Sequence, residues 1–278
     1  MTLLLNGQAF TEVQQPSISP HNRGLLYGHS LFETIAVADC NPLLLDRHLA
    51  RLQDGAARLQ IPLDINAMSQ EITDLSASQS RAVIRASVSI AEGGRGYQSP
   101  ESPESLRMVS LHNYPNHPKC NWQQGINLGL SKIRLASQPA LAGIKHGNRL
   151  EQILARNQWH DDWQEALLLD QKDLVIEATQ ANIFALKNGV LLTPLLDQAG
   201  VTGVMRDYVL SIANKVGVES QIVSLSESDI AHADALFVTN SVIGLWPVKQ
   251  FKERRFSDFD CAHKLLNLMI KDGAIPTL

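Results

Sequence analysis

Short β-type segments, each bounded by turn residues, recur along this chain and constrain its fold more than any other feature. Asn6-Gly7 separates apolar residues 3–5 from residues 9–13, and Asn188-Gly189 separates residues 182–186 from 190–193. Asn-Gly between two apolar runs is typical of a tight hairpin turn, because both turn residues take positive φ angles. The sequence therefore predicts antiparallel hairpins near both ends.

The other predicted elements do not alternate as strand and helix. We expect further strands at residues 31–38, 81–91, 106–112, 126–135, 165–169, 174–178, 222–225 and 235–239. Apolar residues at helical spacing predict helices at residues 45–59, 67–75, 148–159, 202–216 and 257–271. The segment HNRGLLYGHS is expected to be a loop. No GxGxxG or Walker-type loop is present, so we predict an α+β fold rather than a doubly wound parallel sheet.

One polar segment indicates a division into two domains. YPNHPKCNWQQG carries prolines and amides and separates two strand-rich halves. We therefore expect a smaller N-terminal domain at residues 1–113, a linker at 114–124 and a larger C-terminal domain at 125–278.

Composition excludes several function classes. Of 278 residues 44% are hydrophobic, and the formal net charge of -4 disfavours binding to nucleic acid or anionic membranes. No apolar run approaches the roughly 20 residues that span a bilayer, and the N-terminus lacks the basic start of a signal peptide. Three widely separated cysteines fit neither a disulfide framework nor a CxxC metal site. We therefore predict a cytoplasmic protein without a metal.

A single lysine in a small-residue loop is the first candidate for chemistry. Lys145 lies in LAGIKHGNRLEQ, after Ala142, Gly143 and Ile144. An amine in apolar surroundings loses its proton more easily, as a lysine that forms a Schiff base must. Most lysines are solvated surface charges, so this pattern alone is weak.

Glu177 is the second candidate, because it interrupts the apolar strand residues of VIEATQANIF. An acidic residue there is either exposed at the strand end or paired with a positive group. In the second case it can keep a cofactor's pyridine nitrogen protonated, which lets the ring accept electrons.

Two further features are suited to a phosphate. The corner Gly200–Gly203 precedes a predicted helix and offers backbone N–H groups at the positive end of its dipole, with the Thr202 hydroxyl nearby. Arg51 can add a fork of donors. Equally, Thr202 can be a helix cap and Arg51 a solvated helix residue.

Taken together, these motifs resemble the class IV aminotransferases, the fold type IV group of pyridoxal phosphate enzymes, which are D-amino acid aminotransferase-like. The resemblance covers about residues 3 to 250 and is carried, in order, by RGLLYGHSLFET, HLARL, GGRGY, LAGIKHGNRLEQ, EATQANIF and LDQAGVTGVMR. It implies a two-domain α+β fold, pyridoxal 5'-phosphate as cofactor, a small-molecule substrate and a homodimer.

The resemblance also implies roles for individual residues. Lys145 would form the Schiff base with the cofactor, and Glu177 would contact the pyridine nitrogen. The phosphate would be bound by Arg51, Val201, Thr202, Asn240 and Ser241. Arg95, Arg85 and Arg107 would bind substrate carboxylates, beside a loop near Tyr27.

Within the family, GGRGY and LAGIKHxNRLEQ are most similar to members that convert 4-amino-4-deoxychorismate to 4-aminobenzoate and pyruvate, in folate biosynthesis. In that elimination Lys145 would remove a proton, and either Lys145 or Thr34 would protonate the leaving group. The alternatives are a D-amino acid or branched-chain amino acid aminotransferase on the same fold, and a non-catalytic member that binds a partner. The presence of Arg51, Lys145 and Glu177 together disfavours the last.

Two positions depart from the family pattern. Gly28-His29-Ser30 stands where many relatives have Gly-Asp-Gly, and Gly147 stands where a leucine is common. His29 can alter substrate fit, carry a proton or replace a turn residue, and we favour the structural role. Gly147 is expected to loosen the start of the following helix.

Overall fold

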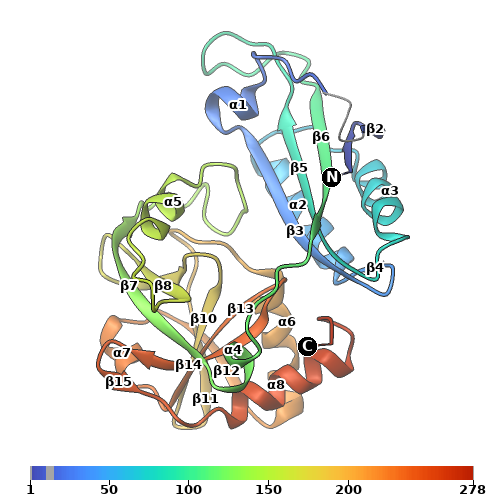
Figure 1. Cartoon of the computed structure of the whole chain (residues 1–278). Coiled ribbons are helices and arrows are strands. Elements are labelled where there is room, and N and C mark those ends of the chain that lie inside the picture. Colours follow the sequence, from blue (N-terminus) through green and yellow to red (C-terminus); the bar gives the residue numbers. More distant parts are fainter. Residues whose placement is uncertain (1, 11–15, 278) are drawn as a thin grey trace. The chain divides into compact units, whose positions relative to one another are not determined.

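A computed structural model describes residues 2–10 and 16–277 of the chain. The chain forms two compact units, one of residues Met1–Pro115 with Ile144–Asn148 and one of residues Asn116–Gly143 with Arg149–Leu278. Here they are named the N-terminal unit and the C-terminal unit (Figure 1). Residues 144–148, which include Lys145, belong to the N-terminal unit, although the sequence assigns them to the second domain. The expected domain limits stay a prediction.

The N-terminal unit is built on a six-stranded antiparallel sheet in the order β2-β1-β6-β5-β3-β4 (Figure 1). Asn6 and Gly7 have φ angles of 46° and 83°, which confirms the first hairpin turn. Residues 11–13 of the expected second strand lie outside the described residues. The strands are β1 (Leu3–Leu5), β2 (Gln8–Phe10), β3 (Ser30–Ala38), β4 (Asn41–Pro42), β5 (Arg81–Ile90) and β6 (Ser105–Asn113).

Two amphipathic helices, α2 (Leu45–Arg58) and α3 (Ile65–Ser76), pack on this sheet through contacts with β3, β5 and β6. Side chains alternate between the two faces of a strand, so Leu31, Glu33 and Ile35 share one face of β3 and Phe32 and Thr34 the other. The first set is buried, whereas Phe32 and Thr34 are half-buried. We name these the helix face and the open face.

A short helix, α1 (Arg23–Tyr27), occupies the segment that was expected to be a loop. The Asn22 side chain accepts a hydrogen bond from the backbone N–H of Leu25 at 3.1 Å, and Gly28 ends the helix in a left-handed conformation. The expectation was wrong because the five-residue helix is too short to show helical periodicity and is held by its caps.

Residues 145–147 lie alongside β3 and extend the sheet there. The Phe32 N–H donates to the carbonyl of Lys145 at 3.0 Å, and the Gly147 N–H donates to the carbonyl of Ser30 at 2.8 Å. A Cβ atom on Gly147 would lie 2.1 Å from Ser30 Oγ. The two departures from the family pattern therefore contact each other, since the serine side chain fills the space that a larger residue at position 147 would need.

The C-terminal unit is built on a nine-stranded mixed sheet in the order β12-β11-β10-β13-β14-β7-β8-β9, with β15 paired to β14 (Figure 1). The pairs β11–β12, β14–β7 and β7–β8 are parallel and the others antiparallel. The strands are β7 (Ile126–Leu135), β8 (Glu165–Asp170), β9 (Val175–Ala178), β10 (Asn182–Lys187), β11 (Val190–Pro194), β12 (Glu219–Val223), β13 (Ala235–Asn240), β14 (Gly244–Phe251) and β15 (Arg254–Arg255).

Six helical segments complete this unit: α4 (Cys120–Gln123), α5 (Leu150–Arg156), α6 (Val204–Ile212), the 3₁₀ helix η1 (Ala213–Val216), α7 (Glu227–Ala231) and α8 (Asp260–Lys271). Gly217 ends η1 in a left-handed conformation with φ 79°, next to residue 216 where the sequence predicts the helix to end. The sequence did not predict β14, a nearly continuous apolar strand that lacks the alternating pattern of a half-buried one. It also missed α7, which a capping box at Ser226 and Asp229 holds.

Helix α5 is shorter than the helix expected at residues 148–159. Arg149 is its N-cap residue, and the Asn148 side-chain amide donates to the carbonyl of Gly28 at 3.4 Å instead. The apolar side chains of α5 are exposed: Leu150, Ile153 and Leu154 have 72%, 53% and 52% of their surface accessible.

A buried carboxyl group lies in the core of the C-terminal sheet. Glu165 on β8 is 2% exposed, and the backbone N–H of Gln180 donates to its Oε2 at 3.3 Å. Burial raises the pKa of Glu165 to about 8, and the charge of Glu177 adds to the rise, while the hydrogen bonds and Arg156 oppose it. The carboxyl group is therefore largely protonated at neutral pH.

Among the described residues, no helix is both long and apolar enough to cross a membrane. All three cysteines are free: Cys40 and Cys120 are exposed and Cys261 is buried. No disulfide supports either unit, so packing and hydrogen bonds hold them.

We predict that Gly147→Ala lowers the free energy of unfolding by about 1–3 kcal/mol, because its Cβ would clash with Ser30 Oγ in a packed site. Adding Ser30→Gly removes the clashing atom and should recover most of that loss. Urea unfolding of both single variants and the double variant gives the interaction energy. Strictly additive losses would contradict the proposed contact.

We predict that Glu165→Gln stabilises the protein increasingly as pH rises. Folding holds a proton on Glu165 that the unfolded chain releases above its ordinary pKa of 4.5, so wild-type stability falls between that pH and about pH 8. A glutamine at this position does not titrate, so the variant does not lose stability in this way. The thermal midpoint of Glu165→Gln should rise above that of the wild type as the pH is raised from about 5 to 8. The control variant Glu253→Gln, at an exposed turn, should have the same pH dependence as the wild type.

Candidate functional site

Lys145 is held on the open face of the N-terminal sheet. Since its carbonyl pairs with the Phe32 N–H, its side chain projects to the same face as Phe32. The Lys145 Nζ atom lies 4.6 Å from the centre of the Phe32 ring. The backbone therefore fixes the direction of this lysine, and an apolar ring contacts its amine.

Arg85 on β5 reaches the same ring. Its guanidinium carbon lies 4.1 Å from the centre of Phe32, and Arg85 is paired with Thr34 in the register of β3 and β5. Partial burial lowers the pKa of Arg85, but the group stays charged at neutral pH. The open face thus brings together an amine, a guanidinium and a hydroxyl.

Arg107 lies on the opposite face of the sheet. Its register partner is Val88, on the helix face, and its Nε and Nη2 atoms donate to Glu71 Oε1 of α3 at 3.0 and 2.8 Å. This ion pair is nearly buried. The position does not favour Arg107 as a substrate ligand together with Arg85.

The GGRGY loop is anchored by Arg23 rather than by Arg95. Arg23 is 4% exposed, and its Nη1 atom donates to the carbonyls of Gly93 and Gly96 at 3.1 and 2.9 Å. Arg95 is exposed on the loop. The ring of Tyr97 packs edge-on against Tyr27 at 5.5 Å, so this loop contacts the end of α1.

His29 has a structural contact. Its Nε2 atom lies 2.8 Å from the carbonyl of Leu59, which ends α2. This favours the structural role for the residue that replaces the usual aspartate.

Arg51 is not a solvated helix residue. Its Nε atom donates to Glu33 Oε1 at 2.8 Å and its Nη2 atom donates to Glu33 Oε2, while His48 Nδ1 lies 2.6 Å from the same Oε2. The Arg51 side chain is 12% exposed, and those of Glu33 and His48 are 2% and 1% exposed. β3 and α2 thus share a buried polar cluster of three side chains.

The charges of this cluster follow from its burial. Burial alone raises the pKa of Glu33, but Arg51 and the hydrogen bond from His48 outweigh it and lower that pKa to about 2. Burial lowers the pKa of His48, and the charges of Arg51 and Lys145 lower it further, against the opposing effect of Glu33. At neutral pH, Glu33 is an anion and His48 a neutral donor through Nδ1.

Sequence reasoning did not identify Glu33 and His48 as site residues. The signal was present in LFET, because strict alternation places Glu33 between Leu31 and Ile35 on a buried face. An acidic residue there needs a buried donor, and the HLARL motif of the next helix supplies two.

In the C-terminal unit, Glu177 is buried rather than exposed at a strand end. It is 5% exposed on β9, and its Oε2 accepts a hydrogen bond from the Val201 N–H at 2.9 Å. Gly200, with φ 84°, lets the chain turn close to β9, since a Cβ there would lie 2.6 Å from Ile176. The alternative of a solvated glutamate was wrong.

The sequence predicts that the backbone N–H groups of the corner before α6 can bind a phosphate, but two of them are already hydrogen-bonded within the protein. The Val201 N–H donates to Glu177, and the Thr202 N–H donates to the carbonyl of Gly143 at 3.0 Å. The N-cap residue of α6 is Gly203, so Thr202 does not cap the helix. The backbone donors that a phosphate could use here begin at Gly203 and the first turn of α6.

Asn240 uses its side chain to build the turn after β13. Its Oδ1 atom accepts from the N–H groups of Val242 and Ile243, both at 2.9 Å, and its Nδ2 atom donates to the carbonyl of Gln180 at 3.0 Å. Any contact of the Asn240–Ser241 turn with a phosphate would therefore involve its backbone or Ser241.

These side chains match the functional groups of pyridoxal phosphate. The amine of Lys145 suits its aldehyde, the guanidinium of Arg51 its phosphate and the carboxylate of Glu177 its pyridine nitrogen. Arg51 and Glu177 are each oriented by hydrogen bonds within their own unit, to Glu33 and Val201 respectively. The donor set therefore fits this cofactor, while the contacts themselves stay a prediction.

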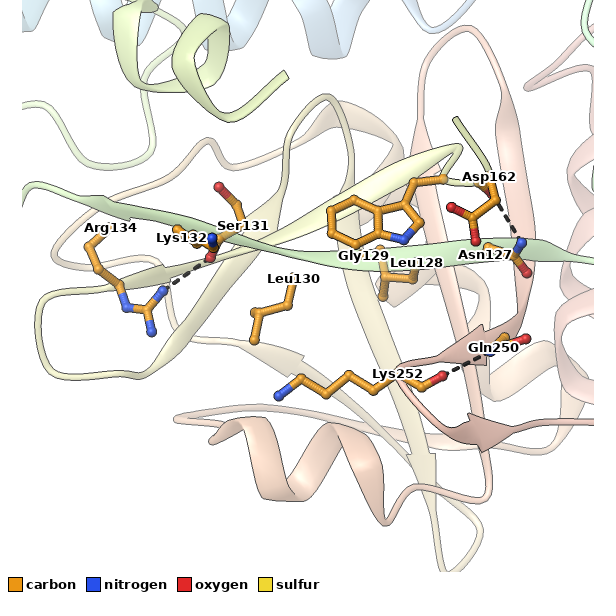
Figure 2. Close-up of a pocket in the computed structure, with 11 residues that line it drawn as sticks. Asn127, Leu128, Gly129, Leu130, Ser131, Lys132, Arg134, Asp162, Gln250 and Lys252 are labelled. Carbon is orange, nitrogen blue, oxygen red and sulfur yellow. Dashed lines mark hydrogen bonds between the residues drawn. The ribbon is translucent and has the colours of Figure 1, made fainter. Parts of the chain in front are cut away.

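A separate pocket of about 490 Å³ in the C-terminal unit contains none of the predicted site residues (Figure 2). It lies along β7, where the pairing with β8 is irregular between Leu130 and Arg134. Trp163 packs over Gly129 in its wall, since a Cβ on Gly129 would overlap the indole at 2.0 Å.

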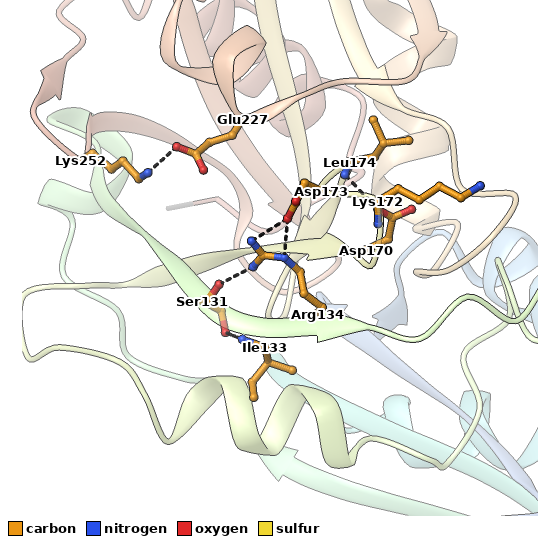
Figure 3. Close-up of polar contacts among 9 residues, drawn as sticks. All are labelled: Ser131, Ile133, Arg134, Asp170, Lys172, Asp173, Leu174, Glu227 and Lys252. Carbon is orange, nitrogen blue, oxygen red and sulfur yellow. Dashed lines mark hydrogen bonds and ion pairs between the residues drawn. The ribbon is translucent and has the colours of Figure 1, made fainter.

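Two of the three cationic side chains that line this pocket form ion pairs (Figure 3). Arg134 is bound to Asp173 at 2.8 Å, and Lys252 is paired with Glu227. The pocket therefore lacks the constellation of amine, buried carboxylate and guanidinium found in the predicted site residues.

Comparison with known proteins supports the same interpretation. Aminodeoxychorismate lyase of Vibrio harveyi is 35% identical over 236 residues, covering 82% of this chain and 84% of that protein. A Methanocaldococcus jannaschii protein whose name proposes a branched-chain-amino-acid aminotransferase is 32% identical, covering 91% and 89%. The crystal structure of 4-amino-4-deoxychorismate lyase from Pseudomonas aeruginosa has a TM-score of 0.92 and 39% identity, covering 98% and 99%.

The amino-transferase class IV family pattern matches residues 30–251, most of the chain. Together with the structural match, it confirms the α+β fold expected of a fold type IV pyridoxal phosphate enzyme. The chain belongs to the amino-transferase class IV family.

Proposed function

We propose that this protein is a pyridoxal phosphate-dependent lyase that converts 4-amino-4-deoxychorismate to 4-aminobenzoate and pyruvate. The observation that carries the proposal is the shared position of Lys145 and Arg85 over Phe32, which puts a base beside a carboxylate-binding cation. The similarity to the lyases of Vibrio harveyi and Pseudomonas aeruginosa supports this choice of substrate.

The cofactor would be held at three points. Lys145 would bind its aldehyde, Glu177 would keep its ring nitrogen protonated, and Arg51 would bind its phosphate. The Thr202 hydroxyl and the backbone or Ser241 side chain of the Asn240–Ser241 turn would help, whereas the Val201 N–H already donates to Glu177. Pyridoxal phosphate, when bound, accepts the electron pair released as a C–H bond next to the substrate nitrogen breaks.

The N-terminal residues would act on the substrate. Lys145 removes the proton from the carbon that bears the amino group, and Arg85 binds a carboxylate of the substrate. The bond between the adjacent carbon and the enolpyruvyl oxygen then breaks, and the ring becomes aromatic. Arg95, exposed on the GGRGY loop, and Tyr27, which contacts Tyr97 of that loop, are further candidates for substrate contact.

Two groups can protonate the leaving enolpyruvate. Thr34 is half-buried on the open face and in register with Arg85, so its hydroxyl is placed on the same side as the base. Lys145 itself carries the abstracted proton. We propose Thr34 as a donor alongside Lys145.

An aminotransferase on the same fold remains the second candidate, since a branched-chain enzyme name is among the relatives. It would use the same cofactor residues. The lyase is favoured by the 39% identity to the Pseudomonas aeruginosa lyase over nearly the whole chain. The three free cysteines favour a reducing compartment, and we propose the cytoplasm as its location.

We predict that the wild-type protein loaded with pyridoxal phosphate releases pyruvate and 4-aminobenzoate in equal amounts from 4-amino-4-deoxychorismate. Lys145→Ala should lose at least about a thousandfold in rate, because both the covalent attachment point and the base are gone. Coupled pyruvate detection and 4-aminobenzoate fluorescence measure the two products.

A different outcome would favour the rival reaction. If a D-amino acid or a branched-chain amino acid with 2-oxoglutarate is consumed rapidly while 4-amino-4-deoxychorismate is untouched, the protein is an aminotransferase. A wild type that forms no Lys145-dependent absorbance with pyridoxal phosphate would refute the cofactor assignment.

We also propose that the protein works as a homodimer. Each unit carries apolar side chains that its own packing leaves exposed, among them Leu25 at 71% and Leu26 at 50% on α1 and Leu150 at 72% on α5. On α5 alone, Leu150, Ile153 and Leu154 are all exposed within five residues, and a cluster of exposed apolar side chains of this kind is typical of a protein interface. A second copy of the chain would cover them.

We predict that the wild type sediments at about twice 30.6 kDa and that Ile153→Glu shifts it toward the monomer, because a buried unpaired charge opposes association. Ile222→Glu is the matched control, since Ile222 is 49% exposed on β12 and Ile153 53% exposed on α5. Sedimentation velocity at several concentrations distinguishes the two. A monomeric wild type would exclude the dimer.

A further inference from the structure

Arg23 is a buried arginine that the proposed reaction does not use. It is the first residue of α1 and is 4% exposed. Its guanidinium donates to three backbone carbonyls, and its central carbon lies 4.9 Å from the centre of the Tyr27 ring. Burying a cation is costly unless its N–H groups are hydrogen-bonded, so the burial of Arg23 depends on those carbonyls.

All three acceptors belong to the GGRGY loop, residues 93–97, which follows β5 at the end of the sheet where α1 lies (Figure 1). Nη1 donates to the carbonyls of Gly93 and Gly96 at 3.1 and 2.9 Å, and Nη2 donates to that of Tyr97 at 3.3 Å. Gly93 and Gly96 stand on either side of Arg95 in the sequence. The backbone is therefore attached to one planar group both before and after Arg95.

The backbone of Arg23 is itself fixed to the sheet. Its N–H donates to the carbonyl of Ala91, directly after β5, at 3.1 Å. The next residue is Gly24, where a Cβ atom would lie 2.6 Å from the Cβ of Ser89, so α1 packs closely on β5. Arg23 thus connects the GGRGY loop to the N-terminal sheet rather than to another loop.

The GGRGY loop also has a tight turn of its own. The Gln98 N–H donates to the carbonyl of Arg95 at 3.1 Å. Gly94 has a φ angle of 75°, and a Cβ atom there would lie 2.1 Å from the carbonyl oxygen of Gln98. A larger residue at position 94 would therefore disturb this turn without changing Arg23.

The fixed loop leaves two of its side chains accessible. Arg95 is exposed, and Tyr97 is 90% exposed although its ring packs edge-on against that of Tyr27. An accessible guanidinium suits a carboxylate, and an accessible aromatic ring suits another ring. Both properties fit the substrate of the proposed reaction, which is a ring that bears carboxylates.

We propose that Arg23 is a positioning residue that fixes the GGRGY loop so that Arg95 is presented to a carboxylate of the substrate. This inference rests on the proposed function, because that function gives Arg95 a substrate to bind. Arg23 is buried beneath the loop and acts through it. The buried guanidinium has a structural role, and the exposed one binds the ligand.

Limited trypsin digestion tests whether Arg23 fixes the loop, independently of any substrate. Cleavage after Arg95 requires the loop to open locally. Arg23→Met removes the donors and keeps an apolar side chain, so it should raise the rate of cleavage at Arg95 about tenfold or more. Arg206→Met is the matched control, since Arg206 is also 4% exposed and donates to the carbonyl of Pro194 at 3.0 Å. It should leave cleavage at Arg95 unchanged.

Steady-state kinetics of the lyase reaction test what the fixed loop does. Arg23→Met should raise KM about tenfold or more and change kcat and the affinity for pyridoxal phosphate less than about twofold, because only substrate binding is affected. Arg95→Gln should have the same effect. If Arg23 acts through Arg95, the double variant should have no higher KM than Arg95→Gln alone.

A second variant covers the case in which Arg23→Met does not fold. Gly94→Ala disturbs the turn of the loop and leaves the buried guanidinium in place, so it should raise both KM and cleavage at Arg95. Gly189→Ala is its control, because Gly189 has a similar φ angle of 78° and a Cβ there meets nothing within 4 Å. It should change neither quantity.

The outcomes separate this inference from the proposed function. If the wild type is a lyase but cleavage at Arg95 is unchanged in Arg23→Met, the loop is not fixed by Arg23 and the inference is wrong. Faster cleavage with an unchanged KM, or additive effects of Arg23→Met and Arg95→Gln, would also overturn it, and the function would stand. If the wild type does not convert 4-amino-4-deoxychorismate, the proposed function fails, and the inference fails with it.

Discussion

The hydrogen bonds between β3 and residues 145–147 are the interaction on which the candidate site depends. They place Lys145 on the open face of the N-terminal sheet, over Phe32 and next to Arg85. A lysine has four rotatable bonds, so only a backbone held in register can give its amine a defined direction. The same pairing explains why position 147 is a glycine when position 30 is a serine, because the two residues approach too closely for a larger side chain at position 147.

Alternate residues of β3 contact different functional side chains on the two faces of the sheet. Its even-numbered residues, Phe32 and Thr34, lie beside the base, whereas Glu33 points to the helix face and binds Arg51 and His48. One strand therefore connects the expected cofactor lysine with the expected phosphate-binding arginine. The period of two in a strand keeps the two sets apart, so that the anion of Glu33 does not compete for the open face.

Much of the fold could be predicted from local patterns. Helices α2, α3 and α8 and most strands lie within a few residues of their expected bounds, because their apolar periodicity is strong. Elements without such periodicity were missed. β14 is nearly continuously apolar, and α1 and α7 are single turns defined by caps at Asn22 and Ser226. The exposed apolar face of α5 was likewise unforeseen, because periodicity identifies a face without stating what covers it.

The sequence by itself determined the family, the set of chemical groups and the order in which they occur. Combined motifs such as LAGIKHGNRLEQ and EATQANIF identify Lys145 and Glu177 without any coordinates. Only the tertiary structure decided which groups are neighbours. It put Arg85 with Lys145 and Arg107 with Glu71 on the other face, and it showed that the Val201 and Thr202 N–H groups are already bonded within the fold. The reason is physical: a residue's type fixes its chemistry, but strand register and burial decide which partner satisfies it.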